Sequence, residues 1–186
     1  MEKRAVWRDK TANLDLNRFV FLDESGAKTN MTRLYGRSCD GGRIKDSAPH
    51  KHWSTTTMIS GLRLDGGTPS MVIEGATDGD VFSAYIEKVL APVLKPEDIV
   101  VMDNLSPHKM SCVRQLVESR GATVWFLPPY SPDLNPIEKM WSKIKAFLRK
   151  VKARTEEALY EAIRDALKTV TTSDAKGWFS SCGYIR

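Results

Sequence analysis

Apolar residues along this chain follow two patterns, short continuous runs in some segments and helical periodicity in others. Continuous runs bounded by turn residues predict buried strands, and they occur in RFVFLDESG (18–26), MVIEG (71–75), DIVVMD (98–103) and ATVWFLPP (122–129). Two segments rich in Thr, Leu, Ile and aromatic residues, both interrupted by glycine, predict further strands of a meander; they are MTRLYGRS (31–38) and HWSTTTMISGLRLDGG (52–67).

Helical spacing of apolar residues predicts helices over residues 77–94, 110–121, 135–152 and 155–170. The last of these has an unbroken apolar stripe that includes Leu159, Ile163 and Leu167. A hairpin meander that precedes alternating strands and helices implies a mixed sheet of about five strands with helices on its faces. The predicted fold class is therefore α/β.

Length and composition favour one globular domain. The chain has 186 residues, of which 41% are hydrophobic and 27% charged. No apolar run approaches the roughly 20 residues that a membrane helix needs, and the N-terminal stretch has no secretion signal. Three widely spaced cysteines without a Cys-x-x-Cys pair predict reduced thiols in a cytoplasmic protein. His50 and His52 are interpreted as surface residues, because no further ligands for zinc stand near them.

Positive charge is concentrated late in the sequence. The whole chain carries a net charge of +5, and KMWSKIKAFLRKVKAR (139–154) contains seven basic residues and no acidic one. The seven are Lys139, Lys143, Lys145, Arg149, Lys150, Lys152 and Arg154. Such a stripe is the electrostatic footprint expected for a phosphate backbone, and the alternative is an ordinary solvated helix face.

Two of the predicted strands share one plan, in which four apolar residues precede an aspartate. These strands are FVFLD, which ends at Asp23, and IVVMD, which ends at Asp103. If the strands are parallel neighbours, both carboxylates emerge at the sheet edge where α/β proteins bind ligands. Their mutual repulsion then calls for a divalent cation, and oxygen ligands favour magnesium or manganese. Each aspartate alone is more typical of a turn than of a ligand site.

Glu138 stands where the turn-rich stretch PPYSPDLNP meets the basic helix. One interpretation is structural, with Asn135 as N-cap and Glu138 hydrogen-bonded back to the Asn135 amide. The other interpretation is chemical. At about 100° per residue, Glu138 shares one flank of the helix with Lys145, Arg149 and Lys152. A carboxylate followed by cations suits a metal ligand with a phosphodiester beyond it.

Three motifs, in this order, resemble the DDE transposases of the mariner superfamily, in particular its bacterial insertion-sequence branch. They are FLDESG (21–26), VVMDNLSPHK (100–109) and LPPYSPDLNPIEKMWSKIK (127–145). Between Asp103 and Glu138 lie 34 residues, the spacing familiar in the aspartate–aspartate–glutamate triads of that superfamily. The likeness extends over nearly the whole chain from Phe19 onward.

The resemblance implies a ribonuclease-H-like catalytic domain over residues 19–172, with a lead segment at 1–18 and a tail at 173–186 packing on the core. It implies that Asp23, Asp103 and Glu138 bind two Mg²⁺ ions, for which Mn²⁺ can substitute. The implied reaction is hydrolysis at transposon ends, followed by attack of the freed 3′-hydroxyls on target DNA, usually at TA. Asn104 and His108 match the same motif, and we expect them to support the carboxylates or to contact DNA.

The implied partners are double-stranded DNA, at transposon ends and target, and a second copy of the chain, since two ends are processed together. We expect Lys139, Lys143, Lys145, Arg149, Lys150 and Lys152 to contact the DNA. Relatives carry an N-terminal helix-turn-helix region that the residues before Phe19 are too few to form. Either the chain is a truncated or split-frame product, or a separate subunit supplies this region. Two alternatives stay open: a catalytically silent DNA-binding fragment, and a ribonuclease acting on RNA–DNA hybrids.

Overall fold

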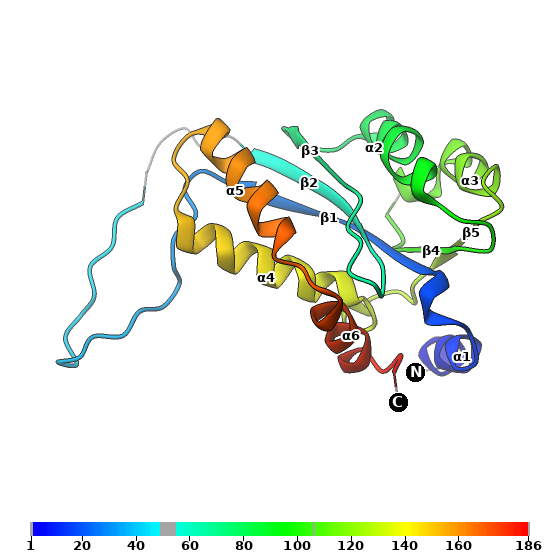
Figure 1. Cartoon of the computed structure of the whole chain (residues 1–186), viewed down its shortest axis with the longest axis horizontal. Helices are drawn as coiled ribbons and strands as arrows, with labels where there is room; N and C mark the ends of the chain where they lie inside the picture. Colours follow the sequence, from blue (N-terminus) through cyan, green and yellow to red (C-terminus); the bar gives the residue numbers. More distant parts are fainter. Residues whose placement is uncertain (1, 49–54, 106, 186) are drawn as a thin grey trace.

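The computed structural model describes residues 2–48, 55–105 and 107–185. Its centre is a five-stranded sheet in the order β3-β2-β1-β4-β5 (Figure 1). The strands are β1 (Phe19–Lys28), β2 (Thr55–Leu62), β3 (Ser70–Glu74), β4 (Ile99–Met102) and β5 (Thr123–Phe126). The mixed α/β sheet predicted from the sequence is therefore confirmed. His50 and His52, together with the first residues of the strand expected at 52–67, lie outside the described residues.

Strand direction changes at β1. β1 pairs antiparallel with β2 along most of its length, whereas on its other side it pairs parallel with β4, from Phe19↔Ile99 to Phe21↔Val101. β4 in turn pairs parallel with β5. The expectation that β1 stops at Asp23 is wrong, because pairing with β2 carries the strand on to Lys28. Asp23 therefore lies mid-strand, but beyond the point where β4 ends.

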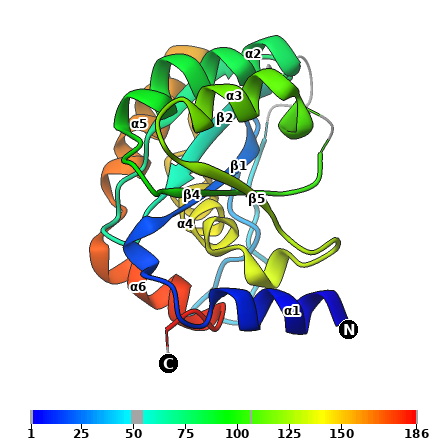
Figure 2. The ribbon, with the colours of Figure 1, turned by 90° about the vertical axis from the view of Figure 1, so that its right-hand side faces the viewer.

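Helices cover both faces of the sheet (Figure 2). One face packs on α4 (Pro136–Val151), α5 (Glu156–Lys168), α6 (Thr172–Ser181) and α1 (Glu2–Thr11), and we call the apolar cluster there the first core. The other face packs on α2 (Gly79–Tyr85), whose helical path continues to Val93, and on α3 (Ser111–Glu118); this is the second core. β1 serves both, because successive side chains alternate: Phe19 and Phe21 belong to the first core, Val20 and Leu22 to the second.

Both ends of the chain form helices that the hydrophobic pattern does not predict. In α1 one side chain, Trp7, carries most of the packing, and it is buried in the first core. In α6 the same is true of Phe179, whose ring meets Phe21 edge-on at 5.3 Å between centroids. α1 buries one large aromatic side chain, and α6 buries only Ala175 beside Phe179, so neither segment shows the long apolar stripe on which a prediction relies.

The prediction of a strand at residues 31–38 is wrong. These residues belong to a loop between β1 and β2 that projects away from the sheet (Figure 1). Leu34 is 66% exposed and Tyr35 90% exposed, so their apolar character reflects no burial. The edge of β1 that such a strand would need is occupied by β2. Within the described residues, no helix is long and apolar enough to cross a membrane.

Candidate active site

The three acidic residues singled out by the sequence line one cavity of about 420 Å³. Asp23 comes from the middle of β1, Asp103 follows β4 directly, and Glu138 stands in the first turn of α4. The register explains the meeting of the two aspartates. Phe21 is paired with Val101 in parallel strands, and each aspartate lies two residues further along, on the same side of the sheet. α4 packs against β1 on that side and brings Glu138 to the cavity.

Asp23 is the carboxylate most affected by its surroundings. Burial raises its pKa to about 7, and the negative charges of Glu138 and Asp103 act in the same direction. A divalent cation bound beside Asp23 would favour the ionised form of this carboxylate. The donor set fits a hard divalent cation, since the acids of the cavity offer only oxygen ligands. Among the described residues, however, no three His, Cys, Asp or Glu side chains stand close enough together to form a ready-made metal site.

Asp103 is held by two hydrogen bonds that reach the same oxygen. Its Oδ1 accepts from the Leu105 amide at 2.9 Å and contacts Nδ1 of His108 at 2.6 Å. Burial alone would raise the pKa of Asp103, but these hydrogen bonds outweigh it and lower the pKa. Neither bond uses Oδ2, so that oxygen is left for a ligand. The structure thus places His108 in direct contact with one of the predicted acidic ligands.

His108 is buried, and its ring lies 4.4 Å from the ring of Phe82 in the second core. Burial alone would lower its pKa, but the carboxylates of Asp103 and Glu24 raise it to about 9. The imidazole is therefore a cation at neutral pH and partly offsets the charge of the acids. Glu24 was missed by the sequence analysis, although it follows Asp23 directly in the FLDESG motif.

Asn104 lines the cavity beside Asp103 and donates from Nδ2 to the Leu127 carbonyl at 2.7 Å. This bond ties the loop after β4 to the residue that follows β5. Asn104 therefore fixes the backbone next to Asp103, whereas its contact with DNA stays a prediction.

Glu138 does not cap its own helix. The Asn135 amide donates to the Pro132 carbonyl at 3.0 Å, so it is not the partner of Glu138, and the Asn135 side chain makes no capping bond. Within the described part of the chain, the Glu138 side chain has no hydrogen bond or ion pair, and it is exposed at the cavity. Asn135 does occupy the N-cap position, as expected. The expected hydrogen bond from the Asn135 amide to Glu138 is wrong, because the turn at residues 132–135 already satisfies that amide.

The turn that leads into α4 is braced by both ends of the chain. Arg4 of α1 donates to Asp133 and, at 3.4 Å, to the Ser131 hydroxyl. Trp7 donates from its indole N–H to the Tyr184 hydroxyl at 3.0 Å, and that hydroxyl donates to the Leu134 carbonyl at 2.7 Å. The start of the helix that carries Glu138 is therefore fixed by both ends of the chain. On the N-terminal side, the contact joins residues that are more than 120 positions apart in the sequence.

The basic residues of α4 divide into two groups. Lys143 donates to Asp174 at 2.6 Å and to the Thr169 carbonyl at 2.7 Å, so it joins α4 to α6. Lys152 pairs at 2.6 Å with Asp46 of the projecting loop. Elsewhere among the described residues, no ion pair involves the remaining four, Lys139, Lys145, Arg149 and Lys150.

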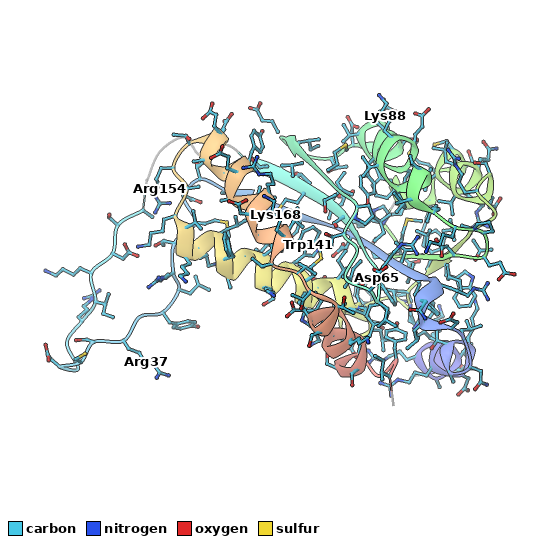
Figure 3. The ribbon with its side chains drawn as sticks, viewed as in Figure 1. Arg37, Asp65, Lys88, Trp141, Arg154 and Lys168 are labelled. Atoms are coloured by element: carbon cyan, nitrogen blue, oxygen red, sulfur yellow. The ribbon has the colours of Figure 1, made fainter. Side chains whose placement is uncertain are left out.

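The base of the projecting loop is also tied to the end of α4. Arg154 lies there (Figure 3) and donates from Nη1 to the carbonyls of Thr29 and Met31, at 2.8 and 2.9 Å. Arg37 lies on the loop itself, away from the sheet (Figure 3). The loop is thus joined to the basic helix at its base and through Asp46.

Comparison with protein-family models shows to which family the chain belongs. The model of the DDE superfamily endonucleases matches residues 18–160, and this range contains Asp23, Asp103 and Glu138. The chain belongs to the DDE superfamily endonucleases. Among individual relatives, this DDE endonuclease is 24% identical over 131 residues to the Tcb2 transposase of Caenorhabditis briggsae, a match that covers 66% of the chain and 47% of that protein. The chain thus spans about half the length of the curated relatives it matches.

Solved structures share the fold. The Mos1 transposase in a paired-end complex with the left transposon end has a TM-score of 0.73 at 14% identity, covering 95% of this chain and 55% of that one. The Mos1 catalytic domain with Raltegravir and Mg has a TM-score of 0.67 at 14% identity, covering 94% and 82%. The catalytic core of BIV integrase has a TM-score of 0.53 at 15% identity, covering 81% of each chain. The DDE endonuclease therefore has the ribonuclease-H-like fold that the resemblance implied.

Proposed function

We propose that this DDE endonuclease is the catalytic domain of a transposase, which cleaves DNA strands at transposon ends and joins the freed 3′-hydroxyls to target DNA. The observation that carries the proposal is the shared cavity of Asp23, Asp103 and Glu138, within a chain that belongs to this endonuclease family. The sequence relatives are transposases, and the Mos1 structures include complexes with transposon ends.

Asp23, Asp103 and Glu138 are the residues that would hold the metal, Mg²⁺ or Mn²⁺, as two ions. When bound, such ions supply Lewis-acid activation of the attacking hydroxyl and stabilisation of the leaving 3′-oxygen. The chain itself contributes the rest. Burial raises the pKa of Asp23, and two hydrogen bonds fix Oδ1 of Asp103 while its Oδ2 has no donor among those bonds. Mos1 structures with Mg and with Mn support the choice of metal.

DNA would approach along the flank of α4. Lys139, Lys145, Arg149 and Lys150 are the cations of this helix with no carboxylate partner among the described residues, so they are free to neutralise phosphates. Lys143 and Lys152 are already paired with Asp174 and Asp46, and binding DNA would cost those contacts. The proposal therefore assigns the main phosphate contacts to the first four.

Finer features belong to the same proposal. They are a TA target, a homodimer in the DNA complex, a helix-turn-helix reader supplied by another segment or subunit, and origin in the bacterial insertion-sequence branch. The sequence relatives reported above come from nematodes. The support for the bacterial branch is the set of motifs around Asp23, Asp103 and Glu138.

The direct test is Glu138→Gln, compared with Glu157→Gln, since Glu157 stands in the first turn of α5 and lines no part of the cavity. Supercoiled plasmid with Mn²⁺ reports strand cleavage, and a duplex with a preformed 3′-hydroxyl end reports strand transfer. We expect Glu138→Gln to lose both reactions while it still binds DNA, and Glu157→Gln to keep them. Equal cleavage by all three proteins would refute a metal-binding role of Glu138.

A further inference from the structure

The residue that follows Asp23 lies on the opposite side of the sheet and approaches the same site from behind. Glu24 continues the row of Val20 and Leu22, which face the second core, whereas Asp23 continues the row of Phe19 and Phe21. Glu24 also stands opposite Ile59 of β2, another member of the second core. Its side chain is 21% exposed, so β1 holds a mostly buried carboxylate beneath the acidic cavity.

Glu24 faces His108 there. Oε1 of Glu24 lies 3.7 Å from Nε2 of His108, close enough for an ion pair but longer than a hydrogen bond. Both atoms are buried, and within the described residues neither has a hydrogen-bond partner. Buried polar atoms without partners are rare and costly. Two such atoms lying against each other indicate one contact that shortens with a small movement of either side chain.

His108 transmits this contact to Asp103. The ring packs against Phe82 on one side, and its Nδ1 holds Oδ1 of Asp103 at 2.6 Å. The order of contacts is therefore Glu24, His108, Asp103. These contacts link strand β1, which carries Asp23, to the loop after β4, which carries Asp103.

We propose that Glu24 is a positioning residue for the metal-binding carboxylates: its carboxylate fixes the His108 ring, and the ring fixes Asp103 with Oδ2 available. Glu24 itself touches neither the cavity nor the substrate. The inference rests on the proposed function in that Asp103 is taken as a metal ligand. Residues that orient a ligand from behind contribute about 10–100-fold to metal affinity.

The test measures Mn²⁺ binding by electron paramagnetic resonance in the absence of DNA. We expect Glu24→Ala to weaken Mn²⁺ binding by about 10–100-fold and Glu24→Gln to recover most of it, because the amide oxygen still accepts from Nε2. Glu74→Ala, at the exposed end of β3, is the matched control and should bind as wild type does. Glu24→Leu fills the same space with apolar atoms and so controls for the packing lost in Glu24→Ala. Its Mn²⁺ affinity should fall as far as that of Glu24→Ala.

Two further readouts separate positioning from a general structural effect. The first is the imidazole Nδ1–H resonance of His108 in the metal-free protein, which should be lost in Glu24→Ala and kept in Glu24→Gln. The second is His108→Asn, whose amide stands where Nδ1 stands but does not reach Glu24. In that background, Glu24→Ala should cost nothing more.

Wild-type Mn²⁺ affinity and an unchanged His108 signal in Glu24→Ala would overturn the proposal. An effect of Glu24→Ala that is equally large in the His108→Asn background would overturn it as well, because the effect would then bypass the histidine. None of these measurements needs DNA. A wild-type protein that binds Mn²⁺ but leaves plasmid intact would instead count against the proposed function, and the two failures are thus distinguishable.

Discussion

Asp103 and Glu138 line one cavity and are held in different ways. The Asp103 carboxylate accepts two hydrogen bonds, and behind it stand His108, Phe82 and Glu24. The Glu138 side chain has no such contact among the described residues, although the turn before its helix is braced by Arg4 and Tyr184. The Asp103 side chain is therefore fixed by its contacts, whereas at Glu138 only the backbone is fixed.

This difference explains why three acids can share a cavity without forming a closed metal site. Preorganised ligands raise affinity because less freedom is lost on binding. Under the proposed function, a free glutamate on a fixed helix would rotate toward a cation held by the two strand aspartates. Asp23 and Asp103 would thus determine the position of the metal, and Glu138 would complete its ligands.

The largest expected effect comes from removing either acid. Asp103→Asn and Glu138→Gln each remove a proposed charged ligand, and a metal centre supplies several kcal/mol of transition-state stabilisation, or about a thousandfold in rate. Plasmid nicking with Mn²⁺ measures it. The comparison predicts one difference between them: Asp103→Asn shifts the His108 resonances in the metal-free protein, and Glu138→Gln does not. Identical spectra for both variants would contradict the distinction between a fixed and a free side.

The brace on the α4 side gives the next largest effect. Trp7 is 5% exposed, and its replacement by alanine should lower the free energy of unfolding by about 3–5 kcal/mol. It also removes the hydrogen bond to Tyr184, so cleavage should fall even at temperatures where the protein stays folded. Urea unfolding and nicking measure the two effects. Val6→Ala, at a 60% exposed position of the same helix, is the control and should change neither.

The two groups of basic residues should separate in a salt titration. Arg149→Ala should weaken DNA binding and reduce the slope of log affinity against log salt by about 1, as expected for one lost phosphate contact. Lys143→Ala should leave that slope unchanged and lower stability instead, because Lys143 joins α4 to Asp174. Fluorescence anisotropy of a labelled duplex at several salt concentrations measures the slope. A slope reduced equally by both variants would show that the ion pair opens for DNA.

The smallest effect concerns pH. The hydrogen bond from Lys143, with a further one from Thr171, lowers the pKa of Asp174 to about 2, from a normal value of 3.8. A depressed pKa stabilises the fold above the normal value, and this contribution is lost as pH falls from about 4 toward 2. Because Asp174 is 27% exposed, we expect only about 0.5–1 kcal/mol. Urea unfolding at pH 5 and pH 2.5 should show a smaller difference for Asp174→Asn than for wild type.

The elements that the sequence predicts correctly are those marked by a continuous apolar run or by helical spacing over several turns. The runs at 98–103 and 122–129 and the periodic helices after residue 135 depend on many residues each, so one exception does not hide them. α1 depends mainly on Trp7, and α6 on Phe179 and Ala175, while the 31–38 segment contains apolar residues that have no partner strand. Long-range contacts of this kind are not encoded in local periodicity.

The same contrast applies to the candidate site. Asp23 and Asp103 could be found because each follows a continuous apolar run, and Glu138 because it begins a helix. Their meeting follows from parallel strands and a crossing helix. Glu24 carries no such signal, since its role depends on His108 reaching it from a loop more than 80 residues later. The pairing of Lys143 and Lys152 with Asp174 and Asp46 likewise depends on tertiary contacts that charge density alone does not reveal.

Anomalous diffraction from crystals soaked in Mn²⁺ tests the central claim most directly. We predict manganese peaks in the cavity, bound by Asp23 and by Oδ2 of Asp103, with Glu138 rotated inward to complete the ligand set and His108 still on Oδ1. Peaks bound outside the cavity, or ions that leave Glu138 turned to solvent, would contradict the assignment of these three acids to one metal centre.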